Sequence, residues 1–197
     1  NKVLVEVYLM TSIFFVRHAQ PDAKWEDDRT RPLTYIGLED SKKVTATLEN
    51  YKIDIFYSSP YKRSIDTILD CANKFNMIIY TDERFRERKQ GINSSIFLEK
   101  RWEDFNFCEE NGENLASVQQ RNIEALKEIL NKHPNKNIVI GTHGTALSTI
   151  LHYYDPSFGC EGFKRILHSM PYIIKLDFDG DILIKSTELL KIDRGYK

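Results

Sequence analysis

The chain has 197 residues, of which 41% are hydrophobic and 29% charged, and its 28 basic and 29 acidic side chains give a formal net charge of −1. This composition excludes wholesale disorder, which requires low hydrophobicity together with high net charge. It also argues against a protein that binds nucleic acid mainly by electrostatic attraction, because there is no excess of Lys and Arg to neutralise phosphates. A chain of this length is expected to form a single domain, 1–197.

The sequence shows no targeting signal. No apolar run approaches the roughly 20 residues that a membrane-spanning helix needs. The apolar stretch 3–10 contains Glu6 and lacks a small-residue cleavage site, so it is not expected to be a signal peptide, and residues 1–9 are interpreted as an extension. Three widely separated cysteines without a CxxC motif are typical of a reducing compartment. We therefore expect a cytoplasmic protein that binds neither membranes nor nucleic acid; the sequence does not indicate an oligomeric state.

Short apolar runs alternate with segments of helical period along the chain, as in an α/β sheet. The runs with the composition of buried strands are 13–16, 54–58, 77–80 and 137–141. Helical spacing of apolar residues occurs in 44–51, 65–75 and 118–130, and a hairpin is expected over 172–184. Near-continuous apolar strands predict a three-layer α/β/α sandwich with a mostly parallel central sheet. The segment 93–111, rich in aromatic and charged residues, is predicted to be a helical insertion over the site.

Two of the five histidines directly follow predicted strands. His18 comes after Arg17 at the end of the first strand, and His143 lies in Gly141-Thr142-His143-Gly144 after the fourth. A third strand end leads to Arg63 in the first turn of a helix. Ligands of such sheets bind at the carboxyl ends of the strands, and a helix N-terminus beside glycine can approach a phosphate. Together these strand ends predict an anion site. The remaining histidines are assigned structural roles: His133 as an exposed helix cap, and His152 and His168 in packing or at the surface.

Six segments, in order over 13–150, resemble motifs of the histidine phosphatase superfamily, in the branch that contains cofactor-dependent phosphoglycerate mutases and their phosphatase relatives. Each is weak alone, but their order and spacing make the resemblance specific. The segments are Phe15-Val16-Arg17-His18-Ala19, similar to Arg-His-Gly; Leu33-Thr34-Tyr35-Ile36-Gly37, similar to Leu-Thr-x-x-Gly; Ser58-Ser59-Pro60-Tyr61-Lys62-Arg63, similar to Ser-Ser-Pro-x-x-Arg; Phe85-Arg86-Glu87-Arg88 before Gly91, similar to the acid segment; Gly112-Glu113-Asn114, similar to Gly-Glu-Ser; and Gly141-Thr142-His143-Gly144, similar to the second-histidine motif.

The resemblance implies a phosphoglycerate mutase-like fold and a role for each matching residue. His18 would attack phosphorus and become phosphohistidine, and Glu87 would protonate the leaving oxygen. The residues implied to bind the phosphorylated substrate are Arg17, Arg63, His143, Gly144, Thr34 and Gly37. Arginine forks suit phosphoryl oxygens, and the cationic groups remove the need for a metal or another cofactor. The motif has Gly where this chain has Ala19, so the turn after His18 must be one that a non-glycine residue tolerates.

Three functions remain open from the sequence. The first is a metal-independent phosphatase that hydrolyses small phosphomonoesters, the second a phosphoglycerate mutase-type phosphoryl transfer, and the third a phosphate-ester-binding module without turnover. Mutase members are longer, with segments that enclose the substrate, so hydrolysis is favoured here. Two residues keep alternative interpretations. Arg31 contacts either a second anionic group of the substrate or Asp27 or Asp28, and Glu87 is either the acid or an exposed partner of Arg84 or Arg88.

Overall fold

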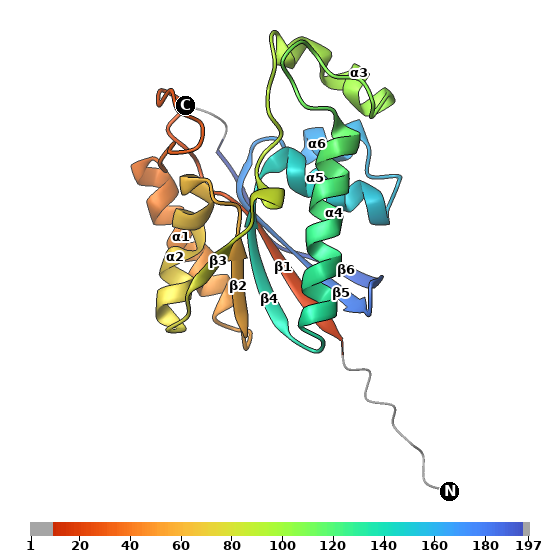
Figure 1. Cartoon of the computed structure of the whole chain (residues 1–197). Helices are drawn as coiled ribbons and strands as arrows, with labels where there is room; N and C mark the ends of the chain where they lie inside the picture. The colour runs from red at the N-terminus through yellow and green to blue at the C-terminus, as the bar shows by residue number, and fades with distance from the viewer. Residues whose placement is uncertain (1–9, 195–197) are drawn as a thin grey trace, which may run out of the picture.

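The computed structural model describes residues 10–194, so the interpretation of 1–9 as an extension falls outside the described residues. One six-stranded sheet carries helices on both of its faces (Figure 1). The strands are β1 (Thr11–Arg17), β2 (Ile55–Ser58), β3 (Ile79–Thr81), β4 (Asn137–Thr142), β5 (Ser169–Asp179) and β6 (Ile182–Asp193). The helices are α1 (Tyr35–Leu48), α2 (Lys62–Lys74), α3 (Leu98–Glu103), α4 (Leu115–Lys132), α5 (Gly144–Tyr154) and α6 (Cys160–Ile166), with 3-10 turns at Glu83–Phe85 and Ser94–Phe97.

The strand order is β3-β2-β4-β1-β5-β6. The first four of these strands run parallel to one another, whereas β5 pairs antiparallel with β1 and with β6. The predicted three-layer architecture with a mostly parallel sheet is therefore confirmed. The hairpin is longer than predicted, because β6 is an edge strand whose polar residues hide its strand pattern. Gly180 in the turn between β5 and β6 has a φ of 58°, a conformation that glycine adopts without strain.

The side chains of β1 show why the central strands are continuously apolar. Ile13 and Phe15 point to one face of the sheet and pack in a core with residues of α4, α5 and α6. Phe14 and Val16 point to the other face and pack against α1 and α2. Successive side chains of a strand alternate between faces, and here both faces are covered (Figure 1). All four side chains are fully buried.

The segment 93–111 is helical in part, as predicted, with a 3-10 turn followed by α3. Trp102 of α3 packs against Phe163 of α6 and against His152 of α5, with ring centroids 5.8 and 5.9 Å apart. The buried carboxylate of Glu109 pairs with Arg88 (2.9 Å) and with Arg101 (3.2 Å). The contacts of Trp102 anchor the insertion on α5 and α6, and the pair with Arg88 joins it to the segment before it.

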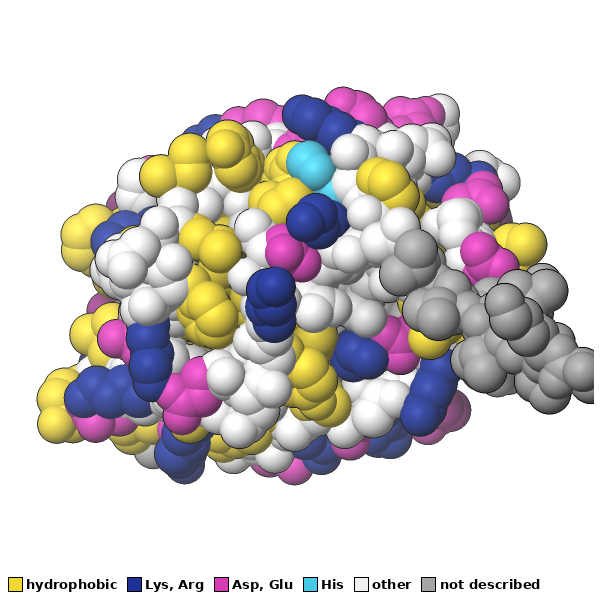
Figure 2. Space-filling view, turned by 90° about the horizontal axis from the view of Figure 1, so that it is seen from below, with side chains coloured by type: hydrophobic (Ala, Val, Ile, Leu, Met, Phe, Trp, Pro, Cys, Tyr) yellow, Lys and Arg dark blue, Asp and Glu magenta, His cyan; other side chains and the backbone are white. Residues whose placement is uncertain are grey.

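The end of the molecule away from the carboxyl ends of the parallel strands is seen in Figure 2, where hydrophobic, basic and acidic side chains are interspersed. At this end His133 is the C-cap residue of α4. It is half-buried rather than exposed as predicted, and its Nε2 lies 2.9 Å from the hydroxyl of Tyr57.

Within residues 10–194, none of the helices combines the length and the apolar character that crossing a membrane requires.

Candidate active site

β2, β4 and β1 are neighbouring parallel strands, so their carboxyl ends lie side by side. The hydrogen-bond ladder continues one residue beyond two of them: the amide of His18 donates to the carbonyl of Thr142 (3.1 Å), and that of Ser59 to the carbonyl of Gly141 (2.9 Å). The rings of His18 and His143 lie edge to face with centroids 5.3 Å apart. The structure thus brings together the three strand ends that the sequence singled out.

His18 is almost completely buried, and its Nδ1 lies 2.8 Å from the carbonyl oxygen of Ala19. A carbonyl oxygen only accepts hydrogen bonds, so Nδ1 carries the proton and Nε2 keeps its lone pair. Burial, and next the guanidinium groups of Arg63 and Arg17, hold the pKa of His18 well below its usual value. The ring is therefore uncharged at neutral pH, with Nε2 available as a nucleophile.

Ala19 follows His18 in a fully buried turn. Its amide donates to the Thr67 hydroxyl of α2 at 2.9 Å. Across residues 10–194, the non-glycine residues with a positive φ are all asparagines. The turn at Ala19 therefore has a conformation that does not require glycine.

His143 is fully buried and is the N-cap residue of α5. Its Nε2 lies 2.7 Å from the hydroxyl oxygen of Ser59. Burial, followed by the charge of Arg63, holds the pKa of His143 well below its usual value, so this ring is also uncharged at neutral pH. Behind it, a Cβ on Gly144 would lie 2.9 Å from the guanidinium carbon of Arg17. Glycine at this position lets Arg17 approach the start of α5.

Arg17 and Arg63 are both buried, and each is held by a backbone carbonyl. Nη1 of Arg17 donates to the carbonyl of Ile166 at 2.5 Å. Nη1 of Arg63 donates to the carbonyl of Asp28 at 2.5 Å and lies 3.1 Å from the carboxylate of the same residue. The guanidinium of Arg63 also lies over the ring of Tyr61, 5.1 Å from its centroid. These contacts fix two cations beside the two imidazoles.

The carboxylate of Glu87 is held by backbone amides from two parts of the chain. Oε1 accepts from the amides of Arg88 (2.8 Å) and Ala146 (3.1 Å), and Oε2 accepts from the amide of Thr145 (3.1 Å). Glu87 thereby caps the N-terminus of α5, where unpaired amides favour an anion. It pairs with the side chain of neither Arg84 nor Arg88, the two partners that the sequence left open.

A pocket of about 360 Å³ opens at this edge of the sheet. Four of the residues predicted at the site line it: His18, Arg31, Arg63 and Glu87. The lining residues come from the loop after β1, the start of α2 and the segment after Glu87: His18, Pro21, Asp28, Arg31, Tyr61, Arg63, Glu87, Arg88, Lys89 and Gln90.

Arg31 takes the second of the interpretations that the sequence left open, since its Nη1 pairs with Asp28 at 3.0 Å. Asp28 thus lies between Arg31 and Arg63, two cations of the pocket. Asp28 lies nine residues beyond the motif that ends at Ala19, and the sequence indicated it only as a partner of Arg31.

Arg17, His143 and Gly144, also predicted at the site, are not among the residues that line the pocket, and neither are Thr34 and Gly37. Thr34 is the N-cap residue of α1: its hydroxyl accepts from the amide of Gly37 (3.0 Å) and donates to the side chain of Gln20 (2.9 Å). A Cβ on Gly37 would lie 2.3 Å from the carbonyl oxygen of Gln20, so only glycine fits there. In the structure these two residues support the loop that follows His18 instead of facing the pocket.

Sequence reasoning also missed the wall formed by Arg88, Lys89 and Gln90. Their position directly after Glu87 was the sequence signal that could have placed them at the site.

The insertion, predicted over the site, contributes no residue of 93–111 to the pocket lining. It packs on α5 and α6 instead, and it reaches the pocket through the pair of Glu109 with Arg88.

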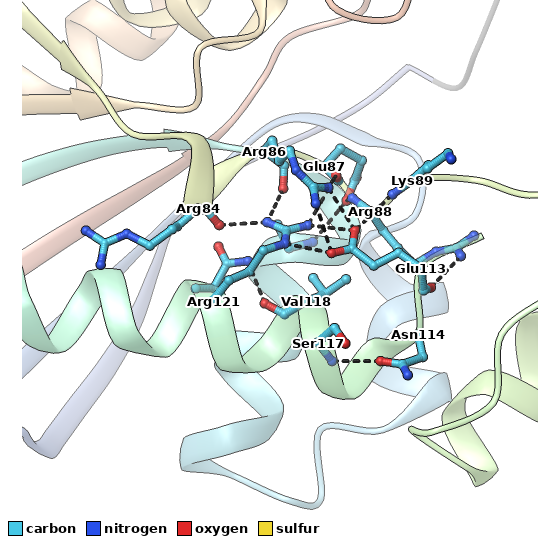
Figure 3. Close-up of polar contacts among 12 residues, drawn as sticks. Arg84, Arg86, Glu87, Arg88, Lys89, Glu113, Asn114, Ser117, Val118 and Arg121 are labelled. Carbon is cyan, nitrogen blue, oxygen red and sulfur yellow. Dashed lines mark hydrogen bonds and ion pairs between the residues drawn. The ribbon is translucent and has the colours of Figure 1, made fainter. Parts of the chain in front are cut away.

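The segment that carries Glu87 is fixed from α4 by Arg121 (Figure 3). Its guanidinium donates to the carbonyls of Arg84 (2.6 Å), Arg86 (2.7 Å) and Glu87 (3.2 Å), and pairs with Glu113 at 2.9 Å. Burial alone would raise the pKa of Glu113, but hydrogen bonds from Arg121 and then Arg86 lower it to about 2. The network holds the Glu87 segment against α4, and sequence reasoning did not identify Arg121.

The fold is shared with solved structures of low sequence identity. A phosphoserine phosphatase from Entamoeba histolytica, solved in complex with 3-phosphoglyceric acid, superposes with a TM-score of 0.75 at 19% identity, covering 92% of this chain and 98% of that one. A mycobacterial glucosyl-3-phosphoglycerate phosphatase superposes with a TM-score of 0.73 at 16% identity, covering 91% and 97% of the two chains.

Sequence comparison agrees with this likeness. Phosphoserine phosphatase 1 of Hydrogenobacter thermophilus is 30% identical over 150 residues, which cover 68% of this chain and 71% of the relative. An uncharacterized phosphatase, PhoE, of Bacillus subtilis is 26% identical over 147 residues, covering 72% and 76%. The family described as histidine phosphatase superfamily (branch 1) matches residues 13–184. The chain belongs to this superfamily.

Proposed function

We propose that this protein is a phosphatase that hydrolyses small phosphomonoesters through a phosphohistidine intermediate on His18, without a metal ion. The observation that carries the proposal is the bond from Nδ1 of His18 to the Ala19 carbonyl, because it leaves Nε2 unprotonated beside Arg63 in the pocket. We further propose that residues 10–194 form one catalytic domain.

In the first step, the lone pair of His18 Nε2 forms a bond to phosphorus while the bond from phosphorus to the alcohol oxygen breaks. The electron pair of that bond goes to the leaving oxygen, which takes a proton from the carboxyl group of Glu87. Arg17 and Arg63 neutralise charge on the three remaining phosphoryl oxygens, and His143 donates a hydrogen bond to one of them. The Ala19 carbonyl stabilises the positive charge that the phosphorylated ring acquires.

In the second step, the carboxylate of Glu87 accepts a proton from water as the water oxygen bonds to phosphorus. The bond between phosphorus and Nε2 then breaks, which returns the neutral imidazole of His18 and releases inorganic phosphate. Glu87 carries its proton again, so the cycle is closed. One group serves as acid and then as base, as microscopic reversibility requires.

Small substrates are supported by the size of the pocket, about 360 Å³, and by its mostly charged and polar lining. Relatives named phosphoserine phosphatase and the structure with bound 3-phosphoglyceric acid make phosphorylated hydroxy acids and amino acids the first compounds to try. Lys89 on the pocket wall is suited to a substrate carboxylate.

The test is phosphate release from an aryl phosphate, phosphoserine and 3-phosphoglycerate, measured with a chelator present. We expect turnover by the wild type and none above background by His18→Ala. Wild-type protein trapped during turnover should carry phosphate on histidine. This phosphate is recognised because it is stable in base and labile in acid. Turnover by His18→Ala, or activity that the chelator removes, would contradict the proposal.

Conversion of 3-phosphoglycerate to 2-phosphoglycerate without phosphate release would instead identify a mutase. Binding of phosphomonoesters with neither reaction would identify a binding module.

A further inference from the structure

Ser59 is fully buried just beyond β2, and its hydroxyl oxygen lies within hydrogen-bond distance of two groups. The backbone amide of Tyr61 donates to Oγ at 3.2 Å, and Nε2 of His143 lies 2.7 Å from the same oxygen. His143 is fully buried as well. Within residues 10–194, no hydrogen-bond partner faces its Nδ1.

The protons of this arrangement can be assigned from the groups that surround them. The hydroxyl proton of Ser59 needs an acceptor, because a buried donor without a partner is unfavourable. The amide of Tyr61 is a donor and cannot serve. If Nε2 of His143 also carried a proton, the Ser59 oxygen would face two donors and its own proton would have no acceptor among the described residues. The hydroxyl therefore donates to Nε2.

We propose that Ser59 holds His143 in the tautomer protonated at Nδ1, so that this nitrogen donates a hydrogen bond to a phosphoryl oxygen of the substrate. The inference rests on the proposed function, because the phosphoryl group supplies the acceptor that Nδ1 lacks. In the opposite tautomer a lone pair on Nδ1 would face the phosphoryl oxygen and repel it. Ser59 is thus a positioning residue, which acts through His143.

Two buried imidazoles of the same tautomer then have complementary tasks. A backbone carbonyl beside Nδ1 of His18 leaves Nε2 as a nucleophile. A hydroxyl beside Nε2 of His143 leaves Nδ1 as a donor. The environment of each ring, and not the residue type, assigns its role.

The tautomer can be measured without substrate, in full-length protein labelled with ¹⁵N-histidine. Two-bond ¹H–¹⁵N correlation spectra distinguish the two tautomers, and the His143 signal is assigned by its loss in His143→Gln. In the wild type we expect Nδ1 protonated and Nε2 unprotonated. In Ser59→Ala we expect signal from the tautomer protonated at Nε2.

Ser58→Ala is the matched control, because Ser58 is equally buried but its hydroxyl contacts Ser64 (3.1 Å) and no histidine. It should leave the tautomer of His143 unchanged. Ser59→Thr keeps the hydroxyl and should retain the wild-type tautomer. The amide spectrum of each variant reports whether it folds, and the wild-type spectrum tests the proposal even if Ser59→Ala does not fold.

In kinetics, the loss of a donor to the transition state should reduce kcat of Ser59→Ala by about tenfold or more. Ser59→Thr should recover most of this loss, and Ser58→Ala should stay close to the wild type. A wild-type His143 protonated at Nε2, or an unchanged tautomer in Ser59→Ala, would overturn the proposal even in an active phosphatase. The expected tautomers in a protein without phosphatase activity would refute the proposed function and leave the tautomer assignment intact.

Discussion

At the scale of single residues, burial makes both imidazoles of the site uncharged. His18 and His143 have pKa values well below the usual one, and in the unfolded chain they titrate near about 6.5. Below that pH the unfolded state binds more protons than the folded state. Their contribution to stability is therefore fully present above about pH 6.5 and is lost as the pH falls towards the folded-state pKa values.

We expect each of the two histidines to reduce the free energy of unfolding by up to about 1.4 kcal/mol for each pH unit below 6.5. Urea unfolding of the wild type and of His18→Asn at pH 7 and 5.5 measures this effect. The decline between the two pH values should be smaller in His18→Asn, which lacks one of the titrating groups. Equal declines would show that His18 does not resist protonation in the folded state.

The proposed role of Glu87 as the acid can be tested by comparing substrates whose leaving groups differ in their need for a proton. An alkyl phosphate needs a proton on its leaving oxygen, whereas an aryl phosphate needs little protonation. Glu87→Gln should therefore slow alkyl esters by about 100-fold or more, and aryl phosphates much less. The measurement is kcat/KM on both classes, with Glu124→Gln on the exposed face of α4 as the control. An equal loss on both classes would argue against Glu87 as the acid.

At the scale of elements, the segment between the 3-10 turn Glu83–Phe85 and the insertion is held by side chains of other elements. Arg121 of α4 donates to three carbonyls of this segment, and the amides at the start of α5 hold the Glu87 carboxylate. The short segment has no regular secondary structure beyond its 3-10 turn. Its conformation therefore depends on these contacts.

Arg121→Ala should lower the free energy of unfolding by about 3 kcal/mol, because it leaves the carbonyls of Arg84 and Arg86 without a donor and removes one of the two arginines that pair with the largely buried Glu113. Arg121→Lys should restore little, since one ammonium cannot reproduce the planar fork of donors. The matched control is Arg84→Ala, whose more exposed pairs with Asp82 and Glu128 are worth about 0.5 kcal/mol. Urea unfolding compares the three variants. A similar loss for Arg121→Ala and Arg84→Ala would contradict the assigned role.

At the scale of the whole molecule, one ion pair joins the end of the last strand to the first helix. Arg194, directly after β6, donates to the carboxylate of Asp40 on α1 at 2.7 and 3.1 Å. Asp40 is buried, and Lys43 also pairs with it at 2.9 Å. The contact joins residues 154 positions apart and closes the sheet against α1.

Asp40→Asn and Arg194→Ala should each destabilise the protein, and a double-mutant cycle should give a coupling energy of about 1 kcal/mol or more between them. Chemical unfolding of the four proteins provides the cycle. Effects that add within about 0.5 kcal/mol would mean that the two side chains contribute independently.

Much of the fold was predictable from the sequence. The runs at 13–16 and 137–141 are apolar on both faces, which occurs when helices cover both sides of a parallel sheet. The end of β6 was not predictable, because an edge strand with polar residues lacks this pattern. The start of β3 was predicted too early for the opposite reason, since the apolar Ile78, predicted in the strand, lies exposed before it.

The sequence by itself determined the central strands, the superfamily motifs and the three strand ends that lead to His18, Arg63 and His143. These depend on local periodicity and on residues close together in the chain. Only the tertiary structure decided that Glu87 faces α5, that Asp28 lies between two arginines and that Thr34 supports a loop. Ser59 and His143 are 84 positions apart, and their contact exists because β2 and β4 are neighbours in the sheet. Pairings of this kind follow from the path of the whole chain, which no local pattern encodes.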